Sequence, residues 1–229
     1  MLDFYISLET EKNKLMDMFC LQDIGFPMEK RVQQYHFSLD LAKDMYHLPR
    51  HQWDKKLEDF LSEAYTKHKD DLASSLSFFQ KYWNQHSEQY FGPINQFFGE
   101  QIPPYRVLLA HFLDGISNWV EPSIVINAYS YQTPNPLYHT YTLLYEIILS
   151  QVFIRTRQIK SAKELTDEDL WMIAELAAFS FLATTFTEFS KVSGTGYPQV
   201  DIHALKFREL MNMRPKFEDF ITKSFNLIK

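Results

Sequence analysis

The spacing of apolar residues predicts several amphipathic helices in the first hundred residues. Apolar positions recur every three or four residues over four stretches, and a short run at 4–8 is consistent with a strand. Gly25 with Pro27, Pro49, and Gly92 with Pro93 are expected to end helices. The predicted helices cover residues 11–23, 28–46, 52–67 and 70–91.

The pattern changes after residue 102. Residues 105–112 are rich in Val, Leu and aromatic side chains, 115–118 is turn-like, and 123–131 alternates with the period of a strand. Two antiparallel strands are the simplest arrangement of these segments. Pro134 and Pro136 are expected to end the second strand, and a helix of about twenty residues is expected to begin near Leu137.

A second apolar helix is predicted from Glu168 to about Lys191. Thr166 is placed as its N-cap, and Asp169 three residues later gives a variant of the capping box. A loop at 193–196 and two closing helices, 201–211 and 215–227, complete the chain.

The fold class expected from these elements is α+β, predominantly α-helical with a small antiparallel sheet. With no internal repeat and no low-complexity linker, we predict one domain over residues 1–229. Its parts are a helical scaffold at 1–100, a strand and helix core at 101–190, and C-terminal helices at 191–229.

Composition narrows the class of protein. The chain has 229 residues, 45% hydrophobic and 23% charged, which is typical of a globular protein. Its net charge of −6 and the lack of a basic block argue against nucleic-acid binding. Cys20 is the only cysteine, so an intrachain disulfide and a cysteine-rich zinc site are excluded, and a buried, inert thiol is expected.

Targeting signals and membrane spans are not expected. Residues 1–14 lack the basic and then apolar order of a secretory signal, so a cytoplasmic location is expected. The least charged stretch, 170–186, is interrupted by Glu175 and is short for a bilayer span.

Two glutamates stand alone in apolar surroundings. Glu146 is the only charged residue in the segment YTLLYEIILSQVFI at 141–154, and Glu175 is the only one in LWMIAELAAFSFLATTF at 170–186. An ionised carboxylate is costly in such surroundings unless it is paired, hydrogen-bonded or metal-bound, and otherwise it takes up a proton. Either each Glu lies on a narrow solvent-facing stripe of its helix, or the two share a site.

The order strand, turn, strand, helix with a central Glu, second helix with an early Glu resembles the gluzincin branch of the zinc metallopeptidases. That resemblance covers about residues 105–185. It places the HExxH motif, which holds zinc with two His and activates water with the Glu, on YEIIL at 145–149, and the third zinc ligand on Glu175. Both histidines are replaced, by Tyr145 and Leu149, and neither side chain substitutes for imidazole as a zinc ligand.

The resemblance therefore implies a zincin-like helix pair packed on a sheet, kept without its metal as a noncatalytic binding or structural module. No cofactor is expected, and peptidase activity by the usual zinc route is not expected. Without metal, two close carboxylates are expected to share a proton or to bind a neutral donor, with Tyr145 the nearest candidate and Tyr141 and Arg155 as further ones. Glu146 or Glu175 then has a raised pKa.

Three alternatives remain open. A relocated zinc site formed by His111, His139, Glu146 and Glu175 is one, although His139 near a helix start is expected rather as a surface or capping residue. A hydrolase with a metal-free carboxylate pair, Glu146 as base and Glu175 as its partner, is another. The third is a helical interaction protein unrelated to zincins.

A partner is suggested by the strand at 123–132. In zincins the corresponding strand lies at the edge of the cleft and pairs with substrate, so an extended peptide or protein segment is expected to add there, with Tyr145 nearby and Tyr129, Tyr131 and Trp119 lining the groove. The alternative is a plain sheet edge whose tyrosines pack or face solvent. The sequence does not fix the oligomeric state.

Overall fold

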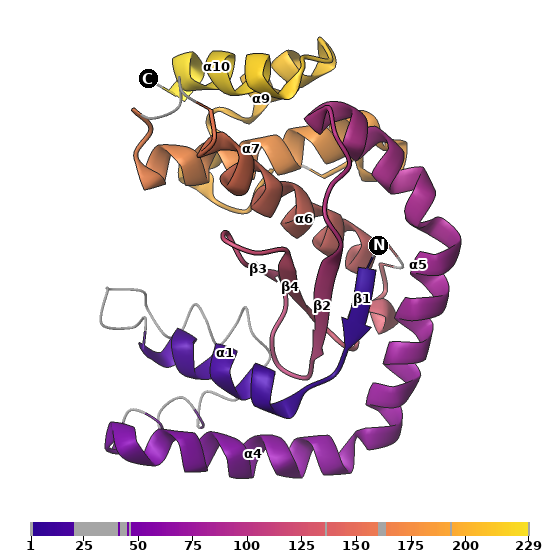
Figure 1. Ribbon diagram of the computed structural model, residues 1–229, viewed down its shortest axis with the longest axis vertical. Helices are drawn as coiled ribbons and strands as arrows, with labels where there is room; N and C mark the ends of the chain where they lie inside the picture. Colours follow the sequence, from indigo (N-terminus) through magenta and orange to yellow (C-terminus); the bar gives the residue numbers. More distant parts are fainter. Residues whose placement is uncertain are drawn as a thin grey trace.

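Helices surround one small sheet in this protein. The computed structural model describes residues 2–20, 41, 45, 47–135, 137–159, 164–192 and 194–228. The predicted class, predominantly helical α+β, is confirmed (Figure 1). The helices are α1 (Leu8–Cys20), α4 (Trp53–Lys67), α5 (Lys69–Phe98), α6 (Tyr138–Thr156), α7 (Asp167–Thr185), α8 (Pro198–Asp201), α9 (Ala204–Asn212) and α10 (Phe217–Ile228). The strands are β1 (Leu2–Tyr5), β2 (Tyr105–Ala110), β3 (Ile116–Ser117) and β4 (Ser123–Asn127).

The sheet is mixed, and the predicted antiparallel pairing of its two main strands is wrong. The strand order is β1-β2-β4-β3, with β1 parallel to β2, β2 parallel to β4, and only β3 antiparallel to β4. The segment predicted as a turn at 115–118 contains β3. Because the chain passes through β3 at the sheet edge and then turns back, β4 inserts between β2 and β3 and runs in the direction of β2.

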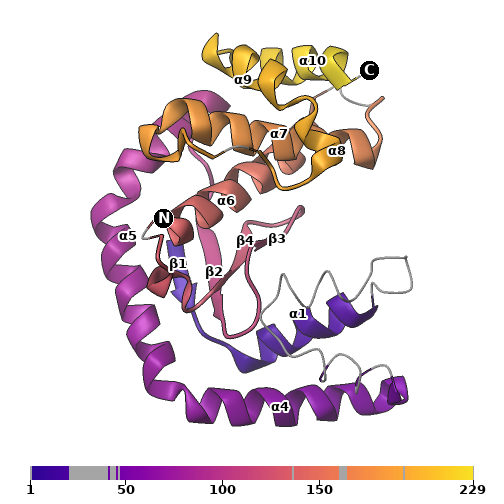
Figure 2. The same ribbon diagram turned by 180° about the vertical axis from the view of Figure 1, so that it is seen from behind.

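Two apolar cores lie on opposite faces of the sheet, as the alternation of side chains along a strand requires. Val107 and Leu109 of β2 belong to the core formed with α5, α6, α7, α9 and α10. Leu108 and Ala110 belong to the core formed with α1 and α4. Figure 2 shows these two layers of helices on either side of the strands.

Helix α5 continues through the predicted break at Gly92 and Pro93. Proline lacks an N–H and removes one helical hydrogen bond, which usually kinks or ends a helix. Ile94, Phe97 and Phe98 beyond it are buried in the larger core, and this packing holds the last turns in helical form. Gly99, with φ of 76°, then ends the helix in the left-handed conformation.

The two apolar helices form, but the second ends at Thr185 and not near Lys191, so the predicted end of that helix is wrong. Thr166 and Asp169 make the capping box at the start of α7, with the Thr166 hydroxyl accepting from the Asp169 N–H at 3.1 Å. Helices α6 and α7 pack directly against each other. The strand predicted over 123–131 ends earlier, at Asn127. No described helix is long and apolar enough to cross a bilayer.

Some predictions concern residues outside the described part. Most of the helix predicted over 28–46 lies there, as do Gly25 and Pro27. The burial predicted for the Cys20 thiol also concerns a side chain outside the described part.

Candidate carboxylate site

The side chains of Tyr145 and Glu175 meet at the interface of α6 and α7. The Tyr145 hydroxyl donates to Glu175 Oε2 at 2.5 Å and lies 3.2 Å from the backbone carbonyl oxygen of Glu175. Both residues are buried, with 9% and 4% of their surface exposed. The expectation that Tyr145 serves as the neutral donor for one of the two carboxylates is therefore met in the structure.

Glu175 has a donor on each of its oxygens. Trp171, one helical turn earlier, donates from Nε1 to Oε1 at 2.9 Å, which complements the Tyr145 bond to Oε2. Burial nevertheless raises the pKa of Glu175 to about 7, and the negative charge of Asp201 adds to this rise, while the two donors oppose it. A solvent-facing stripe, the alternative considered for this residue, is wrong for Glu175.

Glu146 lies on the same helix as Tyr145 and is partly buried beneath the sheet edge. A Cβ atom on Gly115 would lie 3.6 Å from Glu146 Oε1, which places this carboxyl group next to the residue that precedes β3. The pKa of Glu146 is raised to about 8, mainly by burial. The negative charges of Glu175 and Asp114 contribute to the rise, and hydrogen bonding by neighbouring Ser117 opposes it. The two carboxyl groups thus interact, and the raised pKa favours the protonated form of Glu146 at neutral pH.

Two further carboxylates hold the surroundings of the pair in place. Asp114, which is buried, accepts from the Asn127 N–H at 2.8 Å and from the Tyr138 hydroxyl at 3.0 Å, so it joins the end of β4 to the start of α6. Asp201 accepts from the N–H and hydroxyl of Thr195 and orders the loop after 193. Both act as structural anchors whose charges raise the pKa values of the central pair.

Tyr141 and Arg155, the other proposed partners, differ in position. The Tyr141 ring packs against Tyr145, with centroids 5.6 Å apart. Arg155 instead bonds Gln151 and forms an ion pair with Glu100, so it does not neutralise the pair. The prediction of Arg155 as a partner is wrong because it lies nine residues, or about two and a half helical turns, beyond Glu146, at the far end of α6.

The alternative zinc ligands are not brought together. Among the described residues no group of three or more His, Cys, Asp or Glu is arranged to hold a metal ion. His139 is 2% exposed, packs edge-on against Phe78 and Phe79, and neither ring nitrogen has a hydrogen-bond partner in the described chain. The prediction of a surface or capping role for His139 is wrong, because its ring faces the aromatic side of α5.

His111 lies in a separate cluster at the end of β2. Its Nδ1 is 2.9 Å from the Tyr129 hydroxyl, and its ring centroid is 5.0 Å from that of His68. Burial lowers the pKa of His111 to about 4, and the nearby His68 adds to this effect. The cluster has no described contact with Glu146 or Glu175.

The aromatic groove predicted along 123–132 does not form. β4 has β2 on one side and β3 on the other, so it offers no free edge to an added strand. Trp119 precedes β4, and its ring stacks on that of Phe153 with centroids 4.1 Å apart. Tyr129 and Tyr131 follow β4, and the Tyr131 ring stacks on that of Phe78 with centroids 4.3 Å apart. The three rings therefore belong to opposite ends of the strand.

Glu11 is a buried carboxylate that the sequence did not single out. It is fully buried and accepts from the Tyr65 hydroxyl at 2.6 Å and from the backbone N–H groups of His111 and Phe112 at 2.9 and 2.7 Å. It thereby ties α1 and α4 to the turn after β2. Because α1 also carries Glu9 and Asp17, the pattern of charges along this helix does not distinguish the buried one.

The chain matches no protein-family model, no curated protein and no solved structure. Function therefore has to be inferred from the residues and geometry of the site alone.

Proposed function

We propose that this protein is a noncatalytic binding module on a metallopeptidase-like scaffold, with a phenol and carboxylate contact in place of a metal. The observation that carries the proposal is the 2.5 Å contact between Tyr145 and Glu175. In the gluzincin resemblance these are the positions of the first zinc-binding His and of the third ligand. Two positions expected to converge on one metal ion thus converge on each other.

The remaining positions of the motif support a role without zinc. Leu149, at the position of the second His, is 4% exposed and has no atom that can bind a metal. Glu146, at the position of the catalytic Glu, carries a proton at neutral pH because burial raises its pKa to about 8. A protonated carboxyl group cannot accept a proton from water, so the usual peptidase step lacks both its metal and its base.

A metal-free hydrolase is the second candidate, and the observation that favours it is the interaction between the two carboxyl groups. Pairs of carboxyl groups with separated pKa values act as acid and base in other enzymes. Here the base, Glu146, ionises only at about pH 8, so any activity is confined to alkaline solution. The third candidate is a helical interaction protein unrelated to zincins. In such a protein residues 145, 149 and 175 would not correspond to zinc-ligand positions.

Restoring the missing histidines tests the scaffold. The double variant Tyr145→His with Leu149→His is expected to bind one equivalent of Zn²⁺, because residues four apart lie on one helix face and Glu175 already contacts position 145. The matched control adds Glu175→Gln, and we expect its zinc affinity to fall at least about tenfold. A folded double variant that binds no zinc, or binds it equally well without Glu175, would refute the metallopeptidase-like arrangement.

A separate assay tests the noncatalytic assignment. Wild-type protein is incubated with a quenched fluorescent peptide library at pH 6 to 9, with and without added Zn²⁺. We expect no hydrolysis above that of the Glu146→Gln variant. Hydrolysis that appears above pH 8 and is lost in Glu146→Gln would establish the hydrolase instead.

A further inference from the structure

The outer edge of β1 borders a groove that the carboxylate site does not use. Among the described strands β1 pairs with β2 only, so the N–H and C=O groups of its other edge have no strand to bond. Helix α5 runs along this edge in both views (Figures 1 and 2). The groove between them has a volume of about 270 Å³ and is lined by Leu2, Asp3, Phe4, Gln80, Trp83, Asn84 and Ser87.

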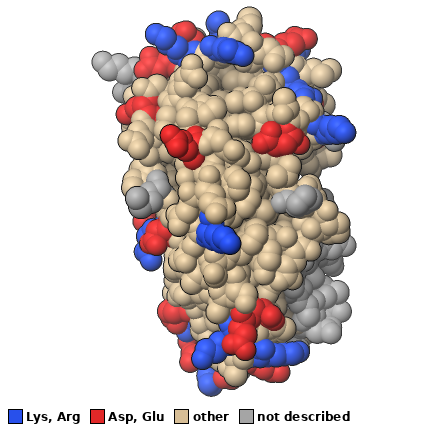
Figure 3. Space-filling model, turned by 90° about the vertical axis from the view of Figure 1, so that its right-hand side faces the viewer, with Lys and Arg blue, Asp and Glu red and all other residues tan. Residues whose placement is uncertain are grey.

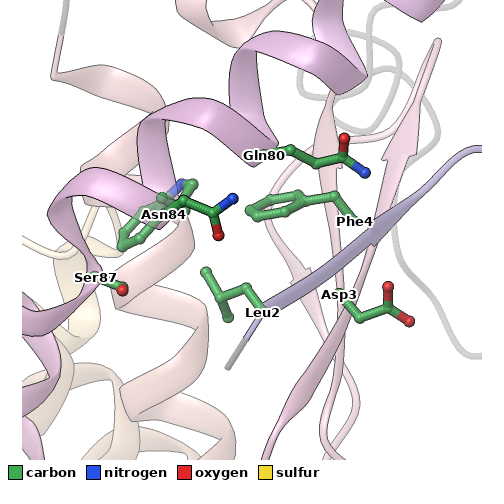
Figure 4. A pocket seen from close by; sticks show the side chains of 7 residues that line it. Leu2, Asp3, Phe4, Gln80, Asn84 and Ser87 are labelled. Atoms are coloured by element: carbon green, nitrogen blue, oxygen red, sulfur yellow. The ribbon is translucent and has the colours of Figure 1, made fainter.

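The α5 side of the groove is one helix face that carries three polar side chains and Trp83. Residues 80, 83, 84 and 87 follow the spacing of one helix face. Figure 4 shows Gln80 and Asn84 extending from α5 towards Phe4, while Asp3 points to the opposite side of β1. The groove is therefore bordered by β1, with the side chains of Leu2 and Phe4, on one wall, and by α5 side chains that include two amides on the other.

Hydrogen-bonding groups around this groove lack partners. Among the described residues the side chains of Gln80, Asn84 and Ser87 have no hydrogen-bond partner. Trp83 is 2% exposed, and its Nε1 is a buried donor without a partner in the described chain. Buried donors are almost always paired in folded proteins, so an unpaired one beside a groove points to a missing ligand or a missing neighbour.

We propose that this groove binds an extended, uncharged peptide segment of a partner protein, which adds to the sheet beside β1. A primary amide offers an N–H donor and a C=O acceptor, as a peptide group does. Gln80 and Asn84 thus bond the edge of the added segment that faces away from β1. The inference goes beyond the proposed function, because the site is separate from Glu146 and Glu175 and does not depend on their role.

The charges around the groove select an uncharged occupant. Asp3 is the only charged residue in the lining, and it points away. Between Leu72 and Phe98 the only charged residues of α5 are Lys81 and Glu88. Figure 3, which views this side of the molecule, shows a broad middle region with few charged atoms. A charged side chain placed in the groove would lose water without gaining a partner of opposite charge.

The size of the groove selects an extended segment. An α-helix with its side chains is about 10 Å or more across, which does not fit between β1 and α5 at this volume. A single strand needs about 4.8 Å of spacing from its neighbour and bonds the open edge directly. β-strand addition is therefore the binding mode that uses the free groups on both walls.

Display selection with two peptide libraries tests the proposal. Random octapeptides of uncharged residues, and a matched library in which half of the positions are Lys or Glu, are selected on the full-length protein. We expect enrichment of uncharged peptides only. The enriched peptide is then synthesised in two forms, each N-methylated at every second residue, so that each form lacks the N–H groups of one edge. We expect the affinity of one of the two forms to fall at least tenfold.

Variants of α5 assign the binding to the groove. Gln80→Ala and Asn84→Ala are expected to weaken binding of the enriched peptide at least tenfold in combination, and Asn84→Asp, which keeps the shape and adds a charge, to weaken it similarly. These exposed helix positions tolerate Ala, and circular dichroism checks that the variants fold. Glu88→Gln, on α5 but outside the lining of the groove, is the control and is expected to bind the peptide as the wild type does. The assay does not involve Glu146 or Glu175, so failure here is distinct from failure of the carboxylate site.

Several outcomes would overturn the proposal. The proposal is wrong if neither library yields enriched peptides, or if the enriched peptides are charged. It is also wrong if the enriched peptides bind the α5 variants as tightly as the wild type. Sedimentation of the free protein adds one more: a dimer that dissociates on Asn84→Asp would show that a second copy of the chain, and not a partner peptide, occupies the edge.

Discussion

The hydroxyl of Tyr145 donates a hydrogen bond to the carboxylate of Glu175 across the interface of α6 and α7, at 2.5 Å. Each residue lies near the middle of an apolar helix, and the contact joins the two helices at buried positions. Trp171 supplies the second donor to the same carboxylate. This three-residue unit explains how a carboxylate persists in a core from which charges are normally excluded.

Removing the phenol hydroxyl is expected to destabilise the protein. Tyr145→Phe leaves Glu175 with the Trp171 donor alone, and we expect a loss of about 1 to 3 kcal/mol in the free energy of unfolding. Because the lost bond lowers the pKa of Glu175, its removal raises that pKa, and the loss should be larger at pH 8.5 than at pH 5.5. Urea unfolding at both pH values measures it.

Tyr141→Phe is the matched control for this substitution. It makes the same change one turn earlier on α6, at a hydroxyl with no described hydrogen bond. Equal effects of the two substitutions at both pH values would show that the Tyr145 bond has no special role.

Glu146→Gln is expected to stabilise the protein at alkaline pH. The folded-state pKa of Glu146 is raised to about 8 from an ordinary value of 4.5, so the unfolded chain ionises first and stability falls as pH rises from 4.5 to 8. The amide removes this loss. At pH 8.5 we expect a gain of at least about 1.4 kcal/mol, the equivalent of one pKa unit. Urea unfolding at pH 4.5 and pH 8.5 measures this gain. If Glu146→Gln were destabilised relative to the wild type by the same amount at both pH values, the raised pKa of Glu146 would be contradicted.

His139 has the opposite pH dependence. Burial lowers its pKa to about 4 from 6.5, so the unfolded chain is protonated first and stability is lost as pH falls from 6.5 to 4. His139→Leu removes this titration and the two unpaired ring nitrogens. On going from pH 7.5 to pH 5, we expect the free energy of unfolding of the variant to rise by about 1 to 2 kcal/mol relative to that of the wild type. His111 titrates in the same range, so some acid sensitivity remains in the variant.

Glu11 is expected to be essential for stability. Glu11→Ala leaves the Tyr65 hydroxyl and the N–H groups of His111 and Phe112 without their acceptor, and we expect a loss of about 3 kcal/mol or more. Asp17→Ala, on the same helix but exposed, is the control and should change the melting temperature little. Similar melting temperatures for the two variants would show that the Glu11 contacts do not hold α1 to the sheet.

The helical elements were predictable because their signals are local. The capping box of Thr166 and Asp169 and the apolar runs around Glu146 and Glu175 are properties of short segments. Helix α6 and the start of α7 formed where expected, whereas α7 ends at Thr185 and not near Lys191. The isolation of two carboxylates in apolar runs was enough to predict a special environment. It was also enough to name Tyr145 as a neutral donor.

Features that depend on distant residues were not predictable. The parallel pairing of β2 with β4 depends on the two-residue strand β3, which is too short to give a pattern of its own. The burial of His139 depends on Phe78 and Phe79 of α5, some sixty residues earlier. The continuation of α5 through Pro93 likewise depends on packing of its last turns.

Site-resolved titration of the two glutamates tests the central claim most directly. The side-chain carboxyl ¹³C signals of Glu146 and Glu175 are assigned with the Gln variants and followed from pH 3 to 10. We expect both to titrate well above 4.5, near 8 and 7, and the Glu146 midpoint to fall when Glu175 is replaced by Gln. Two independent midpoints near 4.5, each unaffected by substitution of the other residue, would show two solvated and separate carboxylates and would contradict the account.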